Sequence, residues 1–440
     1  MRRLSLLLLL LLPAASAPAQ EPPPAAQQSP AAATQGTSLT LDEVVRTALD
    51  QNPGVLAARS AVEESQARVK QARSAFYPQL NFSGLAKAGL SGTMNGLNPL
   101  GLANSPFFDN YATGLNVYHP GLDFGRTRHS VNVIQFRRDA LESDLRAVED
   151  FVVLEAHQAY YNLLRARELE QVAQRAVGSR ELNVRQAQAF YEGELRSKLE
   201  LDLAQVVLGE ARLDLIEARN RILSAHAELG RVMGASQSAD YVLQPPDRTL
   251  PQPEALDDLV QEAYQNRPEL IALERRLAAA HEALRLARSQ RKPLFSIFST
   301  GGWARTTPLI ISRLAAVGAG LSFPVMTFGR LEGLEEEAEQ HINFLDGQLE
   351  DLRQRVSLET RNSYFRLQNS LESLPVRQLQ VEHAREAVRL AEARYRQQLG
   401  TIVELNEAET RLAEAEADNV SELYQVKVAE AELRFAVGRL

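Results

Sequence analysis

The 440-residue sequence contains no cysteine, one tryptophan and four methionines. Without cysteine, the chain has no disulfide scaffold, no thiolate metal site and no thiol that could carry a lipid anchor. After the first 19 residues, no run approaches the ~18 consecutive apolar residues of a transmembrane helix. If the chain spans a membrane, it must therefore do so with strands.

Basic residues are fewer than acidic ones, 48 against 56, so the formal net charge is −8. Residues 1–19 are typical of a signal peptide: Arg2 and Arg3 precede a leucine-rich run, and Ala17 and Ala19 form an A-x-A cleavage site. Loss of the two arginines would take the charge from −8 to −10. An acidic chain lacks the basic surface that phosphate binding requires, so no nucleic-acid partner is expected.

What the sequence does contain is an internal repeat. The Asn-Pro pair ending at Pro53 matches the Arg-Pro pair ending at Pro268, 215 residues further on, and Pro78 matches Pro293 at the same offset. The Phe-Gly-Arg triplet at 124–126 recurs at 328–330, and this second offset of 204 residues holds to the end of the chain. A register kept over a hundred residues indicates a duplicated structural unit.

The repeat predicts the organisation of the chain. After the signal peptide, residues 20–37 are rich in Pro, Ala and Gln and are expected to be a disordered lead-in. The expected first repeat is 38–234, the linker 235–254 and the second repeat 255–440. The Gly/Asn/Pro-rich stretch 91–110 is expected to be a loop, because insertions collect in exposed loops.

Within each repeat, the pattern predicts a short helix (41–50 or 255–265) and then a second helix that begins at a proline. Strands are expected at about 79–90 and 111–122 in the first repeat, and at about 294–303 and 314–325 in the second. Their apolar residues alternate with small or polar ones, as membrane strands require, although alternation alone is as typical of a soluble hairpin. Four strands are fewer than the ~8 of the smallest single-chain barrels, so strands that enter a membrane must be pooled between chains.

The rest of each repeat predicts a long helical hairpin. A helix begins near residue 127, turns near 193–197, and returns with an apolar heptad seam. In the first repeat the seam consists of Leu201, Ala204, Leu208, Ala211, Leu215, Ala218, Ile222, Ala225, Leu229 and Val232. Pro375 falls inside the long helix of the second repeat, where it is expected to kink or interrupt the helix.

These motifs resemble the TolC family of outer-membrane efflux proteins. The resemblance is carried by Leu-Thr-Leu-Asp-Glu at 39–43, Ala-Arg-Ser-Ala-Phe-Tyr-Pro at 72–78, both Phe-Gly-Arg triplets and Ala-Glu-Ala-Glu-Leu at 429–433. It implies a mainly α fold with a small β portion: a homotrimer that pools four transmembrane strands per chain into a barrel, continued by coiled-coil hairpins across the periplasm. It also implies a passive channel in the outer membrane, in contact with its lipid. The channel would have no cofactor and would work with a periplasmic adaptor and an inner-membrane pump, in efflux or type I secretion.

The resemblance also implies where the functional residues lie. Its pattern of Tyr-x-x-Gly followed by two acidic residues and alanine places the periplasmic aperture at Tyr395, Glu404 and Glu407, with Glu200 as the matching acidic residue of the first repeat. Glutamates replace the family's aspartates, Gln398 stands at the usual glycine position, and Gly193 falls one place early. The adaptor-contacting tips are expected at Gly193 and Ser197 in the first repeat and at Gly400 and Thr401 in the second. The alternative is that the glutamates are a solvated helix face and the glycines simply make turns.

Two other classes fit less well. An enzyme is disfavoured because the seven histidines are scattered, and no metal-binding spacing, Gly-x-Ser-x-Gly or P-loop is present. A soluble periplasmic adaptor usually has one hairpin inserted in β-rich domains, whereas this chain has two hairpins in tandem. The sequence does not indicate whether the cargo is a drug, a metal ion or a polypeptide.

Overall fold

The computed structural model describes residues 39–90, 107–235, 241–245, 249–252, 254–307 and 310–440. Both repeats belong to one compact unit, Ser38–Leu440. The expected signal peptide and lead-in lie outside the described residues, as does most of the expected loop.

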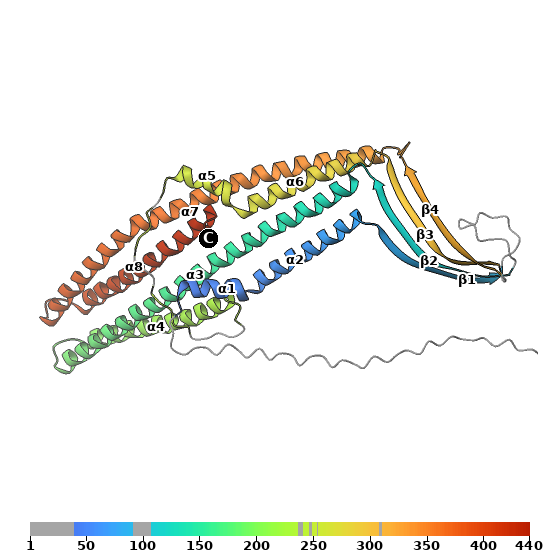
Figure 1. Cartoon of the computed structure of the whole chain (residues 1–440). Helices are drawn as coiled ribbons and strands as arrows, with labels where there is room; N and C mark the ends of the chain where they lie inside the picture. The colour runs from blue at the N-terminus through green and yellow to red at the C-terminus, as the bar shows by residue number, and fades with distance from the viewer. Residues whose placement is uncertain (1–38, 91–106, 236–240, 246–248, 253, 308–309) are drawn as a thin grey trace, which may run out of the picture. The chain divides into compact units, whose positions relative to one another are not determined.

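The two repeats contain the same helices and strands in the same order, except that the short 3-10 helix η1 occurs in the first repeat alone among the described residues (Figure 1). The first comprises α1 (Leu41–Gln51), α2 (Pro53–Arg73), η1 (Ser74–Phe76), β1 (Gln79–Leu90), β2 (Phe107–Leu122), α3 (Arg126–Glu192) and α4 (Lys198–Val232). The second comprises α5 (Leu256–Asn266), α6 (Pro268–Ser289), β3 (Leu294–Thr307), β4 (Ile310–Ser322), α7 (Arg330–Arg396) and α8 (Ile402–Val437).

Local sequence signals account for the helix starts. Thr40 and Glu43 form a capping box, in which Glu43 N–H donates to Thr40 Oγ1 at 3.3 Å and Thr40 N–H donates to Glu43 Oε2 at 2.8 Å. Asn52 ends α1 and caps α2, because its Oδ1 accepts from Gly54 N–H at 2.8 Å while Pro53 occupies the first helical position.

The long helices α3 and α7 have 67 residues each. Pro375 lies inside α7 without interrupting it, so the expected interruption is wrong. The helix loses one backbone hydrogen bond there but is held on both sides by its packing against α8. A kink at this position remains a prediction.

Helices α3 and α4 form one antiparallel hairpin and α7 and α8 the other, and α8 also packs against α3 (Figure 1). The heptad seam of α4 faces its hairpin partner: Ala204, Leu208, Ala211, Ala218, Leu229 and Val232 are buried, and the other seam residues are partly buried. The two repeats meet where β2 pairs with β3 and where α3 contacts α6 and α8.

The four strands form one antiparallel sheet in the order β1-β2-β3-β4. Phe107 pairs with Leu90 and Asn110 with Lys87, so the expected loop is shorter than 91–110 because its last four residues extend β2. Strand β3 continues to Thr307 instead of ending near 303, and β4 occupies 310–322 instead of 314–325.

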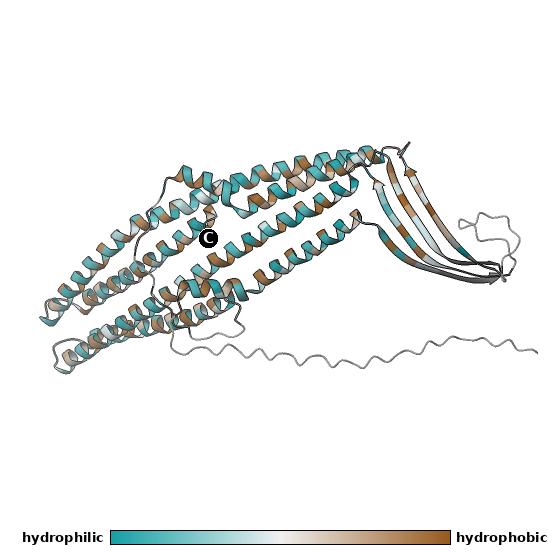
Figure 2. Cartoon of the chain, in the orientation of Figure 1, coloured by the Kyte–Doolittle hydropathy of each residue, from teal (hydrophilic) through white to brown (hydrophobic). Residues whose placement is uncertain are grey.

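The register gives the sheet two different faces. Leu80, Val117 and Val317 lie side by side with Ser299, and large apolar residues on this face are uncovered: Leu80 is 64% and Val317 81% exposed. On the other face, Asn116 donates to Ser83 Oγ at 2.6 Å and accepts from Thr300 Oγ1 at 2.7 Å. Figure 2 shows the alternation of apolar and polar residues along the strands.

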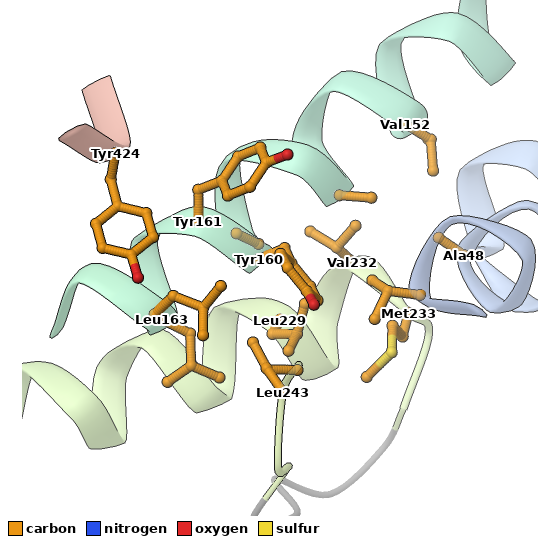
Figure 3. Close-up of a cluster of buried hydrophobic side chains, with 14 of the residues drawn as sticks. Ala48, Val152, Tyr160, Tyr161, Leu163, Leu229, Val232, Met233, Leu243 and Tyr424 are labelled. Atoms are coloured by element: carbon orange, nitrogen blue, oxygen red, sulfur yellow. The ribbon is translucent and has the colours of Figure 1, made fainter. Parts of the chain in front are cut away.

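The largest core lies where α1, α2, α3 and α4 meet (Figure 3). Tyr160 of α3 packs beside Leu229 and Val232 of α4, and its hydroxyl donates to Gln244 O at 2.6 Å. Burial raises the pKa of Tyr160 to about 12. Residues 241–245 of the linker are thereby tied to the core.

Candidate functional site

The two hairpin tips, residues 193–197 between α3 and α4 (the first tip) and residues 397–401 between α7 and α8 (the second tip), have the same backbone design. In the first tip, Leu195 N–H donates to Phe190 O at 2.9 Å and Glu194 N–H to Tyr191 O at 3.0 Å. The second tip repeats this with Leu399 to Arg394 at 2.8 Å and Gln398 to Tyr395 at 3.0 Å. This is the Schellman pattern, which satisfies the last carbonyls of α3 and α7.

The residue that reverses the chain is not a glycine in either tip. Glu194 has φ +55° and Gln398 φ +64°, the left-handed conformation that glycine adopts most easily. Gly193, one place earlier, has an ordinary φ of −81°. Gly193 and Gly400 flank the reversing residues instead of making the reversal themselves.

Replacing Glu194 and Gln398 together by glycine is expected to stabilise the hairpins by about 0.5–1 kcal/mol per position, because the steric cost of a left-handed L-residue is removed. The measurement is the apparent midpoint of thermal loss of helical circular dichroism in detergent, at one scan rate. Gly193→Ala is the matched control and should change the midpoint little. A lower midpoint for the double glycine variant would show that the Glu194 and Gln398 side chains hold the tips.

Arg196 joins the first tip to the second. Its guanidinium donates to Gly400 O at 2.8 Å and to Glu200 Oε1 at 3.2 Å, and lies 5.7 Å from the centre of the Tyr395 ring. Sequence reasoning did not identify Arg196, since the repeat has Gly400 at the corresponding position.

Tyr395 is fully buried between the two tips, where its ring meets Phe190 edge to face at 5.6 Å. Burial and the nearby Glu200 carboxylate raise its pKa. The Tyr395 hydroxyl and Glu200 Oε2 are both buried without a hydrogen-bond partner among the described residues. In this single chain, Tyr395 is therefore a packing residue between the tips and does not face solvent.

Glu404 and Glu407 lie on the first two turns of α8 with exposed side chains. Their nearest cations are distant and equally exposed: Arg394 is 3.7 Å from Glu404, and Arg411 is 3.9 Å from Glu407. Such pairs contribute little, so both carboxylates are available to another molecule or ion.

The four expected tip residues differ in their environment. Gly193, Ser197 and Thr401 are exposed, and Thr401 caps α8 by accepting from Glu404 N–H at 3.2 Å. Gly400 is buried, and an added Cβ would lie 3.1 Å from Glu404 Oε2 and 3.2 Å from Arg394 Cβ. Its role in this chain is to let the second tip close.

A buried ionic cluster lies further along the hairpins, between α3 and α8. Glu409 is 6% exposed and accepts from Arg180, from Ser179 Oγ at 2.7 Å and from Asn183 Nδ2 at 2.7 Å. Arg180 is 5% exposed, and burial lowers its pKa against the opposing effect of Glu409. The heptad seam did not reveal this cluster, because the cluster lies on the face of α8 that meets the other repeat.

Among the residues that the structure describes, no helix is both long enough and apolar enough to cross a membrane. Over the same residues, no group of three or more histidine, cysteine or acidic side chains is arranged to hold a metal ion.

A two-faced four-stranded sheet carried on two helical hairpins defines a class, the bacterial outer-membrane channels with periplasmic helices. A model of the outer membrane efflux protein family matches residues 44–235 and 259–439. The chain belongs to this family. It is an outer-membrane channel protein that serves as an exit duct for efflux, and it is not an enzyme.

Individual relatives agree over most of the chain. The pyoverdine export outer membrane protein OpmQ of Pseudomonas aeruginosa is 23% identical over 394 residues, covering 86% of this chain and 80% of that protein. The outer membrane protein TolC of Vibrio cholerae is 24% identical over 421 residues, 91% of each chain. The crystal structure of VceC from Vibrio cholerae superimposes with a TM-score of 0.79 at 19% identity, covering 90% of this chain and 96% of that one.

The family also fixes the general mode of action. Its members are trimeric channels that work with adaptor proteins and inner-membrane pumps. The mainly helical fold with a small antiparallel sheet, expected from the sequence, is confirmed, as is the resemblance to the TolC family.

Proposed function

We propose that three copies of this chain form one exit duct, whose hairpin tips meet a periplasmic adaptor and whose Glu404 and Glu407 line the periplasmic aperture. The observation that carries the proposal is the sheet, which exposes a face with Leu80, Phe82 and Val317 and leaves β1 and β4 without a second neighbour among the described residues. Lipid tolerates apolar side chains but not unpaired strand edges, so the copies must close the sheet on one another.

The aperture assignment is supported by charge and exposure. Glu404 and Glu407 are exposed in the single chain, and three copies would bring six carboxylates to the ends of the α8 helices. A ring of carboxylates at a constriction attracts cations and repels anions. The duct should therefore be cation-selective while its tips are closed together.

The adaptor contact is assigned to the exposed surface of the two tips. Gly193 and Ser197 of the first tip and Thr401 of the second are accessible, whereas Gly400 shapes the turn beneath them. Because the same Schellman turn occurs twice in each chain, a trimer would present six similar tips. An adaptor could then bind every tip with one kind of helical surface.

The first test is the gel mobility of detergent-extracted membranes with and without boiling. A band near three times the monomer mass that collapses on boiling is expected for an embedded trimer. Monomer confined to the aqueous periplasmic extract would contradict the proposal.

Substitution of both aperture glutamates tests the site. In planar bilayers, Glu404→Gln/Glu407→Gln is expected to lower the ratio of cation to anion permeability by about an order of magnitude, because two carboxylates per chain leave the constriction. The control Glu64→Gln/Glu217→Gln removes the same charge from exposed positions on α2 and α4, and should leave the ratio unchanged. Equal ratios for the aperture variant and the wild type would remove these residues from the aperture.

A further inference from the structure

Arg126, the first residue of α3, clamps the end of α6. Its Nε donates to Ser289 O at 3.2 Å, and its Nη2 donates to Gln290 O at 3.0 Å and Lys292 O at 2.5 Å. The last carbonyls of a helix have no partner within the helix and carry partial negative charge, so a guanidinium satisfies both needs. This clamp holds the first repeat to the second where helices join strands.

Arg330 is the counterpart of Arg126 in the second repeat, but it binds no helix end among the described residues. Phe328 and Gly329 have φ of +48° and +87°, which match +51° and +90° at Phe124 and Gly125, so the backbone before Arg330 is folded in the same way. Arg330 is exposed, and its side chain has no hydrogen-bond or ion-pair partner among the described residues, although its backbone N–H donates to Thr327 O at 3.0 Å. Beside it, Phe328 is 92% exposed, compared with 40% for Phe124.

The end of α2 is not bound by an arginine of its own chain among the described residues. Ser289, whose carbonyl Arg126 binds, is 2% exposed, whereas Ser74, its counterpart 215 residues earlier, is exposed. By the same offset, the counterparts of Gln290 O and Lys292 O are Ala75 O and Tyr77 O. In this chain Ser74 O accepts from Tyr77 N–H at 3.0 Å and from the Gln79 side chain at 2.8 Å, and Tyr77 O accepts from the same Gln79 amide at 3.2 Å. Gln79 thus stands where a guanidinium would bind: an incoming arginine would replace it on Ser74 O and could join it on Tyr77 O, which has a second lone pair.

The difference in burial continues along the helices. On α3, which packs against α6 and α8, Leu154, Tyr161 and Val172 are 8%, 8% and 5% exposed. Their counterparts on α7, found 204 residues later, are Leu358, Phe365 and Val376, and they are 59%, 54% and 56% exposed. The face of α7 that would take part in an α3-like contact is therefore bare and apolar. A surface like that of the other repeat would fit this face of α7, and a second copy of this chain supplies such a surface.

We propose that Arg330 of one copy donates to the carbonyl oxygens of Ser74, Ala75 and Tyr77 of the next copy, and that this clamp fastens neighbouring subunits where helices meet strands. The inference rests on the proposed trimer and adds its subunit contact. Within the chain, Glu282 reinforces the Arg126 clamp by accepting from Asn132 at 3.2 Å. The counterpart of Glu282 is Ala67, so Arg330 has no such reinforcement between copies.

The test compares Arg330→Ala with Arg330→Lys and with Arg126→Ala, which breaks the same clamp inside one chain. Arg330→Ala is expected to speed dissociation of the detergent-solubilised oligomer by roughly tenfold or more at a fixed elevated temperature, since charge-assisted hydrogen bonds between copies are lost. The dissociation rate of Arg330→Lys should lie between those of the wild type and Arg330→Ala, because an ammonium lacks the planar fork of a guanidinium. Arg126→Ala should lower the midpoint of helical unfolding more than it speeds dissociation. Wild-type dissociation kinetics for Arg330→Ala would overturn the clamp.

Cross-linking tests whether residues 75 and 330 of neighbouring copies are close together, independently of the dissociation rate. The chain has no cysteine, so Ala75→Cys with Arg330→Cys introduces a single reactive pair per interface. A short bifunctional maleimide should give covalent dimers and trimers with this double variant. Arg126→Cys with Gln290→Cys should link within one chain and give a band near the monomer mass. An intact oligomer without cross-linked 75/330 species overturns the clamp, whereas a wild-type chain that forms no membrane oligomer overturns the proposed function itself.

Discussion

Arg180→Ala is expected to destabilise the helical part of the protein by about 3–5 kcal/mol, because it leaves the buried Glu409 carboxylate without a cation. Glu409 keeps its hydrogen bonds from Ser179 and Asn183, which places the expected loss near the lower end of that range. The loss falls on the contact between α3 and α8, which holds the two hairpins of one chain together.

The midpoint of thermal loss of helical circular dichroism measures this effect, with the purified oligomer in detergent. The matched control is Arg212→Ala, which removes an exposed pair with Glu181 between α3 and α4 and should cost less than about 1 kcal/mol. A second variant, Arg180→Met/Glu409→Leu, should recover most of the stability, since replacing both ions by apolar groups of similar size avoids the unpaired charge. If Arg180→Ala has the same midpoint as the Arg212→Ala control, the Arg180–Glu409 pair is solvated in the native assembly.

The ionic cluster of Arg180 and Glu409 has no counterpart in the other repeat. The counterparts of Arg180, Asn183 and Glu409 in the other repeat are Ala384, Ala387 and Gln205, none of which is charged. By the repeat, the α3–α8 contact within a chain would correspond to a contact between α7 of one chain and α4 of the next in the proposed trimer. Only the contact within a chain would carry the ionic cluster. Motions that open the tips would then separate neighbouring chains more easily than the two hairpins of one chain.

The duplication made most of the fold predictable from sequence. Helix periodicity, the prolines at 53 and 268 and the heptad seam all depend on local spacing, and the structure places helices where they indicate. The ends of the strands were less predictable. Phe107 and its neighbours follow a stretch of glycine, asparagine and proline, yet they join β2 because β1 offers a continuous set of pairing partners.

The candidate site was predictable only in part. The helical pattern located both tips and the resemblance implied their role, but neither could show that Arg196 spans them, because a contact between two hairpins leaves no periodic trace in the sequence. Tyr395 was expected at an aperture, whereas the single chain buries it against Phe190. The reversal of the chain by Glu194 and Gln398 was also missed, since glycines stood close enough to suggest an ordinary glycine turn.

Gly234→Ala is the second substitution with a large expected effect. Gly234 follows α4 with φ +75°, and an added Cβ would lie 2.3 Å from Gln51 O and 2.7 Å from Gln51 C, at the joint between α1 and α2. The left-handed conformation alone costs about 1–2 kcal/mol for an L-residue, and forcing packed backbone apart costs about 1–3 kcal/mol more. The joint cannot move freely, because Asn52 both caps α2 and donates to Val232 O at 2.9 Å.

The second repeat has a glycine at the corresponding position. Gly438, the counterpart of Gly234, has φ +80°, but its nearest contacts to an added Cβ begin at 3.0 Å, on Asn266. Gly438→Ala should therefore incur the conformational cost with a smaller steric cost than Gly234→Ala. Gly209→Ala, in the middle of α4 with no neighbouring atom within 4 Å, should instead raise the melting midpoint through better helix propensity. The expected order of midpoints is Gly209→Ala above wild type, then Gly438→Ala, then Gly234→Ala. If Gly234→Ala and Gly438→Ala have the same melting midpoint, the α1–α2 joint moves to make room for the methyl group and does not fix the end of the first hairpin.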